Sequence, residues 1–184
     1  MRIIGVDPGT TVTGIGIVEY RKDKIYLIHY DVISLNSKDT LPVRLKKIYD
    51  ECLSYMEKYS PDEFAIETAF YGKNIQSTLK LGQARGVAII AALNSNLEIS
   101  EYSPREVKKS VTGNGASSKE QVQYMVRSIL SLREKVIAID SSDALAVALC
   151  HYYCRQNMID KGYSGSKNNT WKNFAERNPG RIIG

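Results

Sequence analysis

The sequence predicts a mixed α/β layer fold, in which helices flank a five-stranded sheet, and three observations support it. Segments rich in β-branched residues open the chain at 2–7, 12–20 and 24–35, as is typical of strands. Helical and strand patterns then alternate, which indicates right-handed parallel crossovers added to an antiparallel start. The length of 184 residues suits one domain whose core needs neither disulfides nor zinc.

The three opening strands follow one another with short connections, so we expect them to pair as antiparallel hairpins. The first is an apolar run that Pro8-Gly9 stops directly after Asp7. In the second, Gly14 and Gly16 interrupt the apolar residues. A glycine inside a strand allows another element to approach the backbone closely.

A helix is expected to follow the third strand. Asp39-Thr40 stands before it, Pro42 lies in its first turn, and its apolar stripe continues to about Tyr59. The elements expected next are a fourth strand at 64–67, a long helix at 74–93 and a fifth strand at 97–102.

The last third of the chain is expected to be helical and then to lose its pattern. The predicted elements are a short helix from Pro104 to Lys109, a loop at 113–115, a helix from Ser118 and a helix at 141–156. Beyond Ile159 the sequence turns to Gly, Ser, Asn and Lys without periodicity. We therefore divide the chain into a domain at 1–158 and a basic tail at 159–184 that is expected to be disordered.

Four carboxylates are expected to meet at one end of the sheet. Asp7 ends the first strand and Glu67 ends the fourth. Asp140 and Asp143 are three residues apart at a helix start, so both can face the same way from its first turn. Ser- and Asp-rich helix starts are also ordinary caps. If this helix crosses the two strand ends, the side chains form an all-oxygen site of the kind that Mg²⁺ prefers.

The distribution of charge agrees with such a site. The net charge is +5, and the segment 70–119 carries seven basic against three acidic residues. Cations beside a carboxylate cluster suit an enzyme that acts on a phosphate backbone. A solvated helix face would give the same pattern, so charge alone leaves both interpretations open.

Composition also bounds the location. No stretch approaches a membrane span, and the first strand begins within three residues of Met1, so we expect neither membrane association nor a signal peptide. The three cysteines lack a disulfide-framework spacing, which fits a reducing cytoplasm. Cys150, His151 and Cys154 could be metal ligands, but they continue an apolar helix in which buried thiols are common.

Five motifs occur in one order along residues 1–158. They are Ile4-Gly5-Val6-Asp7-Pro8-Gly9-Thr10 with Thr13-Gly14, Ala65-Ile66-Glu67, Lys80-Leu81-Gly82-Gln83-Ala84-Arg85-Gly86, Val107-Lys108, and the segment from Asp140 to Ala148. With these motifs the chain resembles the RuvC family of bacterial Holliday-junction resolvases, which are crossover junction endodeoxyribonucleases of the ribonuclease-H-like and integrase superfamily. The resemblance implies a ribonuclease-H-like fold.

The resemblance implies that Asp7, Glu67, Asp140 and Asp143 are the catalytic, metal-binding carboxylates. Some family members carry His at the position of Asp143, so the site of this chain is all-oxygen. Two Mg²⁺ ions per subunit, about 4 Å apart and replaceable by Mn²⁺, would activate water and stabilise the leaving 3′-oxygen. Cleavage would leave 5′-phosphate and 3′-hydroxyl ends.

The resemblance further implies DNA contacts by Phe70, Lys73, Lys108 and Lys119. Phe70 matches an aromatic that the family inserts beside bases at the crossover, where stacking is worth about 1–3 kcal/mol. On residue type alone, packing under a loop is the commoner role for Phe70. Lys73 matches a nearby basic residue, and Lys108 and Lys119 match lysines at the scissile phosphate, where Lys119 would offset transition-state charge. Surface solubility is the alternative for each lysine.

The implied substrate is four-way junction DNA, and the implied partners are a second copy of the chain and the RuvA–RuvB branch-migration complex. Two symmetric nicks require two equivalent sites, which a homodimer supplies. The helix from Asn74 is the expected interface because it carries small residues: Gly82, Ala84, Gly86 and Ala88. The same residues could equally pack that helix onto its own sheet.

Three other functions compete with this one. An ATPase of the actin and Hsp70 class shares the turn at 7–11, but such proteins bind nucleotide between two lobes and this chain is too short for both. A ribonuclease-H-like nuclease acting on RNA shares the carboxylates, although the motif at 80–86 and Phe70 favour junctions. A non-catalytic binder would gain nothing from carboxylates that repel phosphates.

Overall fold

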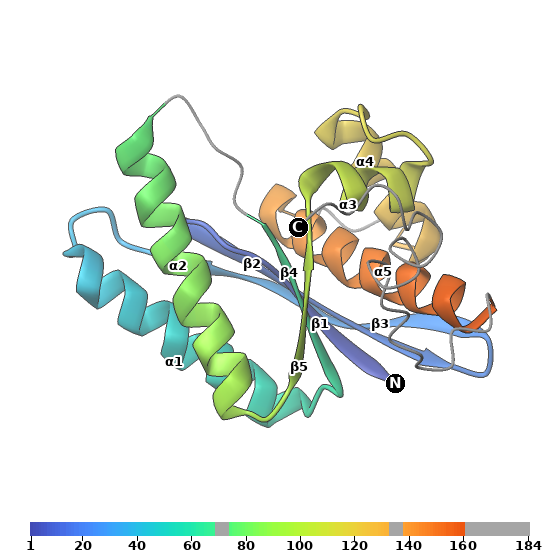
Figure 1. Cartoon of the computed structure of the whole chain (residues 1–184), viewed down its shortest axis with the longest axis horizontal. Helices are drawn as coiled ribbons and strands as arrows, with labels where there is room; N and C mark the ends of the chain where they lie inside the picture. The colour runs from blue at the N-terminus through green and yellow to red at the C-terminus, as the bar shows by residue number, and fades with distance from the viewer. Residues whose placement is uncertain (69–73, 133–137, 161–184) are drawn as a thin grey trace, which may run out of the picture. The chain divides into compact units, whose positions relative to one another are not determined.

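The computed structural model describes residues 1–68, 74–132 and 138–160 (Figure 1). The chain divides into two compact units, Met1–Cys154 and Arg155–Gly184. The predicted domain boundary at 158 stays a prediction. Residues 159 and 160 of the predicted tail belong to a helix, and the predicted disorder of residues 161–184 falls outside the described residues.

One five-stranded sheet forms the centre of the first unit, with the strand order β3-β2-β1-β4-β5. The strands are β1 (Arg2–Asp7), β2 (Val12–Arg21), β3 (Lys24–Ser34), β4 (Glu63–Glu67) and β5 (Glu98–Tyr102). β1 pairs with β2, and β2 with β3, in antiparallel fashion. β1 pairs with β4, and β4 with β5, in parallel. The mixed sheet with an antiparallel start is therefore confirmed.

Helices cover both faces of the sheet (Figure 1). They are α1 (Leu41–Tyr59), α2 (Ile75–Asn94), α3 (Pro104–Thr112), α4 (Lys119–Ile129) and α5 (Ile139–Asp160). One hydrophobic cluster joins the sheet to α1 and α2, and a second joins its other face to α3, α4 and α5. Among the described residues, no helix combines the length and the apolar character that crossing a membrane requires.

The period-two alternation of the strands decides which side chains reach the site. On β4, Phe64 and Ile66 are buried against α1 and α2, whereas Ala65 is buried on the face of α5. On β1, Ile3 likewise faces the α5 side. Asp7 and Glu67 are an even number of residues from Ile3 and Ala65, so both side chains project toward α5.

Three helix boundaries differ from the prediction by more than one residue, and one of them is the end of α5, which lies at Asp160 rather than at about Gln156. α5 begins at Ile139 rather than Ser141, so Asp140 lies in its first turn and Asp143 follows directly after that turn. α3 continues to Thr112, beyond Lys109, because Val107 and Val111, four residues apart, are both buried in the core. It ends at Gly113, whose φ of 79° is the left-handed cap conformation.

Candidate active site

The first two carboxylates lie at the carboxyl ends of neighbouring parallel strands. Asp7 is the last residue of β1, and Glu67 is the last residue of β4. The pairing of Val6 with Ile66 brings the two strand ends level with each other. The parallel pairing thus joins two acidic residues that are sixty positions apart in the sequence.

Three hydrogen bonds from two side chains, Thr13 and Arg44, hold the turn after Asp7. The Thr13 hydroxyl accepts from the Gly9 amide at 3.2 Å and donates to the Gly9 carbonyl at 3.1 Å. The Arg44 guanidinium donates to the Thr10 carbonyl at 2.7 Å. Thr13 is fully buried. The sequence analysis gave Thr13 and Arg44 no role, because the partners of both are backbone atoms on another segment.

Glycines in the sheet seat the first turns of α5. A Cβ at Gly14 would lie 2.0 Å from the carbonyl oxygen of Asp140. A Cβ at Gly5 would lie 2.3 Å from the carbonyl oxygen of Ala144, and one at Gly16 would lie 2.6 Å from the Leu145 amide nitrogen. Gly14 is the cross-strand partner of Asp7. The helix can therefore approach the sheet backbone beside Asp7 only because these positions lack side chains.

The carboxylates line a hollow of about 200 Å³. Its walls are Asp7, Glu67, Pro104, Val107, Lys108, Lys119, Val122 and Asp143. Three of the four predicted carboxylates and both predicted lysines of the described chain are therefore brought together. Asp140 does not line the hollow, but its negative charge contributes to the raised pKa of Asp7.

Burial and crowding of like charges shift the ionisation of the two strand-end residues. Burial raises the pKa of Asp7 to about 8, with further increases from the charges of Glu67 and Asp143. Burial also raises the pKa of Glu67 to about 7, and the charge of Asp143 adds to this. Without a compensating cation, protons neutralise this site near neutral pH.

Lys119 is the cation that the chain itself supplies. Its Nζ donates to Oδ2 of Asp143 at 2.8 Å. This hydrogen bond raises the pKa of Lys119, and the charges of Asp143, Asp7 and Asp140 raise it further. Lys108 lines the same hollow, and its charge lowers the pKa of Glu67. The sequence analysis placed Lys119 beside a phosphate and did not predict its contact with Asp143.

The donor set suits a hard divalent cation, because it consists of carboxylate oxygens in a partly desolvated hollow. Within the described ranges, no three His, Cys, Asp or Glu side chains are close enough together to coordinate one metal ion. The carboxylates repel one another, and Lys119 holds Asp143 by a hydrogen bond, which keeps these side chains apart. Phe70 and Lys73, the other two predicted DNA contacts, lie outside the described residues.

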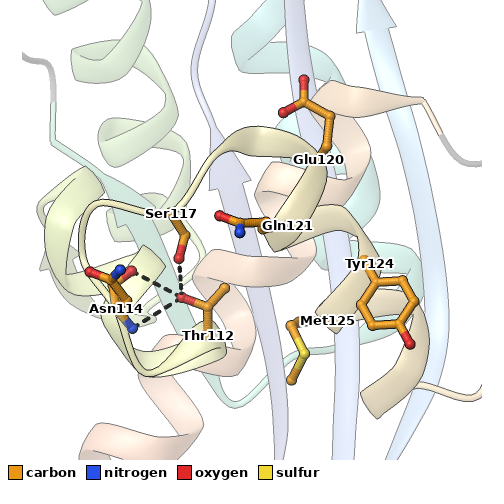
Figure 2. A pocket seen from close by; sticks show the side chains of 7 residues that line it. All are labelled: Thr112, Asn114, Ser117, Glu120, Gln121, Tyr124 and Met125. Atoms are coloured by element: carbon orange, nitrogen blue, oxygen red, sulfur yellow. Dashed lines mark hydrogen bonds between the residues drawn. The ribbon is translucent and has the colours of Figure 1, made fainter.

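A second hollow of about 480 Å³ lies on α4 and the loop that precedes it (Figure 2). It is lined by Thr112, Asn114, Ser117, Glu120, Gln121, Tyr124 and Met125. The Thr112 hydroxyl lies 2.8 Å from that of Ser117 and accepts from the Asn114 amide, so these polar groups bond to one another and hold the loop. None of the predicted site residues lines it.

Comparisons with known proteins agree on one family. The family model described as crossover junction endodeoxyribonuclease RuvC matches residues 3–151. The RuvC of Salinibacter ruber is 47% identical over 182 residues, which are 99% of each chain. The RuvC of Chloroherpeton thalassium is 44% identical over 185 residues, covering 100% of both.

Solved structures show the same likeness. The Thermus thermophilus RuvC structure superposes with a TM-score of 0.77 at 31% identity, covering 85% of this chain and 96% of that one. The structure of T. thermophilus RuvC in complex with Holliday junction substrate matches with a TM-score of 0.77 at 29% identity and the same coverage. The predicted ribonuclease-H-like fold is thereby confirmed.

Proposed function

The chain belongs to the RuvC family of crossover junction endodeoxyribonucleases, and we propose that it resolves Holliday junctions by paired, symmetric nicks. The observation that carries the proposal is one hollow in which Asp7, Glu67 and Asp143 face Lys108 and Lys119. Carboxylates for a cation beside lysines for a phosphate are what hydrolysis of a DNA backbone requires. The T. thermophilus RuvC bound to junction substrate supports the choice of DNA.

In this proposal Asp7, Glu67, Asp140 and Asp143 hold Mg²⁺, with two ions per subunit and Mn²⁺ as a substitute. When bound, the cations supply activation of water and neutralisation of charge on the leaving oxygen. The raised pKa values of Asp7 and Glu67 support this assignment, because such a site gains most from a cation. Asp140 would contribute from the first turn of α5.

The two lysines act at the phosphate. Lys108, on α3, and Lys119, at the start of α4, line the hollow with the carboxylates and bind the scissile phosphodiester. Water adds to phosphorus as the bond from phosphorus to the 3′-oxygen breaks. The 3′-oxygen takes up a proton, which leaves 5′-phosphate and 3′-hydroxyl ends. An ammonium group has three N–H donors, so Lys119 can contact Asp143 and the phosphate together, which couples cation binding to phosphate binding through this side chain.

A homodimer formed through α2 would supply two such sites. Exposed apolar residues and open glycines recur along one side of α2 at spacings of three and four: Ile75, Leu79, Gly82, Gly86, Ile90 and Leu93. A Cβ added at Gly82 or Gly86 would meet nothing within 4 Å, so a second helix has room to approach. Ala84 and Ala88 are instead fully buried in the core of their own domain. Of the four small residues predicted at the interface, only the two glycines can contact a second copy of the chain.

Two further expectations rest on family membership. We propose that a RuvA–RuvB complex delivers junctions to this enzyme, and that it works in the cytoplasm. Neither expectation is needed for the chemistry of the site.

The test is cleavage of a synthetic four-way junction beside a linear duplex of matching sequence, with and without Mg²⁺. We expect paired cuts in the junction alone, only with the divalent ion, and with religatable ends. Cutting of an RNA duplex instead, or ATP hydrolysis without DNA cutting, would replace the proposal by one of its rivals. Binding to junctions without cutting in either Mg²⁺ or Mn²⁺ would make the protein a non-catalytic binder.

Asp7→Asn tests the site itself. The amide keeps the shape of the carboxyl but loses the charge that holds a cation, so cutting should fall at least about 100-fold while junction binding survives. Asp50→Asn is the matched control, because Asp50 is an exposed α1 residue paired only with Lys46 among the described contacts. Cleavage by Asp7→Asn near the wild-type rate removes Asp7 from the site.

A further inference from the structure

A buried polar chain contacts the middle of α5, about two turns beyond Asp143. His151 Nε2 is 2.5 Å from Oε2 of Glu63, and His151 Nδ1 is 2.8 Å from the Tyr102 hydroxyl. The side chains of His151 and Glu63 are 7% and 10% exposed. One neutral imidazole tautomer satisfies both bonds, since Nε2–H donates to the carboxylate and Nδ1 accepts from the phenol. These groups take no part in the proposed chemistry.

The chain joins α5 to the same strand that carries a catalytic residue. Glu63 is the first residue of β4 and Glu67 is the last. At the other end of this strand, Asp143 lines the hollow with Glu67. α5 therefore runs antiparallel to β4: Asp143 lies beside Glu67 at one end of the strand, and His151 contacts Glu63 at the other.

The spacings along helix and strand match. Asp143, Val147 and His151 form one row of residues four apart on α5. Eight helical residues span about 12 Å, and the four strand steps from Glu63 to Glu67 span about 13 Å. A helix held at His151 consequently places Asp143 beside Glu67. A slip of one helical turn, about 5.4 Å, would carry Asp143 out of the hollow.

Tyr102 connects the same imidazole to the strand ends at the hollow. It is the last residue of β5 and the cross-strand partner of Glu67. Its carbonyl accepts from the Thr68 amide at 2.8 Å, directly after Glu67. His151 thus contacts one residue at the start of β4 and another beside the end of β4.

We propose that His151 is a positioning residue for the metal site: its bonds to Glu63 and Tyr102 fix the register of α5 along β4 and so set Asp143 against Asp7 and Glu67. The glycine seat lets the helix approach the sheet, and packing of the buried residues from Ala144 to Cys150 holds it there. The hydrogen bonds of His151 add a directional constraint, and losing a hydrogen bond to a buried carboxylate is costly, which gives the register a definite energetic preference. The proposal rests on the proposed function, because the site it serves is that of the nuclease.

The experiment measures the affinity of the metal-free full chain for Mn²⁺ by paramagnetic resonance, and junction cutting separately. His151→Ala should weaken Mn²⁺ binding by about 10-fold, as removal of groups that orient metal ligands typically does. His151→Gln should restore most of the affinity, because its amide can donate to Glu63 and accept from Tyr102. Met56→Ala is the control for lost stability, since Met56 is buried on the opposite face of the sheet, against α1 and α2.

A spectroscopic readout confirms the contact itself. The chain has two histidines, so the imidazole N–H signals of the metal-free protein can be assigned with one variant. One signal should be protected from exchange with water, and it should vanish in His151→Gln and shift in Glu63→Gln.

Three outcomes overturn the proposal: an unchanged Mn²⁺ affinity in folded His151→Ala, an equal loss in Met56→Ala, or no rescue by His151→Gln. A wild-type chain that binds no Mn²⁺ and cuts no junction would instead refute the proposed function. The two failures are therefore distinguishable.

Discussion

In the metal-free site, bound protons and the Lys119 ammonium group offset the negative charge of the carboxylates. At neutral pH, Asp7, with a pKa of about 8, is largely protonated and Glu67, with a pKa of about 7, is about half protonated, while Lys119 neutralises Asp143. A divalent ion must displace these protons and this ammonium group. Its affinity should consequently rise with pH up to about 8.

The raised pKa of Asp7 gives the stability of the metal-free protein a definite pH dependence. Below about pH 4, Asp7 is protonated in both the folded and the unfolded chain, since its ordinary pKa is 3.8. Between this value and about 8 the unfolded chain loses the proton and the folded chain keeps it, so the free energy of unfolding falls as pH rises.

Asp7→Asn removes this dependence, because its amide is uncharged in both states. In EDTA, the variant should gain about 2–4 kcal/mol over wild type at pH 8 relative to pH 5. Denaturant unfolding at the two pH values measures it. Parallel pH curves for wild type and variant would show that Asp7 ionises normally in the fold.

Lys119→Gln tests whether the hydrogen bond from Lys119 to Asp143, or only the positive charge of Lys119, affects Mn²⁺ affinity. The variant frees Asp143, so Mn²⁺ binding should tighten by about 3- to 10-fold while junction cutting falls. Lys108→Gln removes the same charge from the same hollow, and among the described contacts Lys108 has no ion pair. Equal gains in Mn²⁺ affinity from both variants would mean that the hydrogen bond to Asp143 contributes nothing.

At the scale of elements, the close packing of α5 on the glycines of β1 and β2 brings the carboxylates of the helix to those of the strands. A Cβ at Gly14 would meet backbone, not a side chain that can turn away, because the Asp140 carbonyl would lie 2.0 Å from it. Gly14→Ala must therefore push the first turn of α5 off the sheet.

The expected cost of Gly14→Ala is about 1–3 kcal/mol of stability, together with a loss of Mn²⁺ affinity. Gly113→Ala is a comparison of similar cost, about 1 kcal/mol, caused only by the positive φ of a helix cap. Thermal unfolding and Mn²⁺ titration of both variants separate the two effects. An unchanged Mn²⁺ affinity in folded Gly14→Ala would show that α5 tolerates the displacement.

At the scale of the whole molecule, the exposed stripe on α2 decides whether two sites work together. Leu79 and Ile75, 64% and 75% exposed, would place apolar surface in water if the chain stayed single. A charge at the centre of a helix contact has to be desolvated on association.

Leu79→Lys should therefore convert a dimer into monomers in sedimentation equilibrium, and paired cutting of a junction into single nicks. Val43→Lys is the control, since Val43 is 54% exposed on α1. Dimers that persist in Leu79→Lys would move the interface away from this stripe.

The sequence alone determined the elements and two of the site positions. Alternating β-branched residues marked the strands, and the abrupt ends of the first and fourth runs marked Asp7 and Glu67, because strand periodicity and turn chemistry are local properties. The boundary errors occurred at helix ends. At the end of α3 and the start of α5, burial of Val111 and packing against the sheet glycines outweigh the local signals.

Only the tertiary structure decided how distant side chains combine. The pairing of Lys119 with Asp143, the backbone contacts of Thr13 and Arg44, and the chain from Glu63 through His151 to Tyr102 each join segments with no shared local pattern. It also separated the glycines of α2, which face outward, from the alanines, which face the core. The physical reason is that residue type fixes what a group can bond to, whereas packing fixes which partner lies within reach.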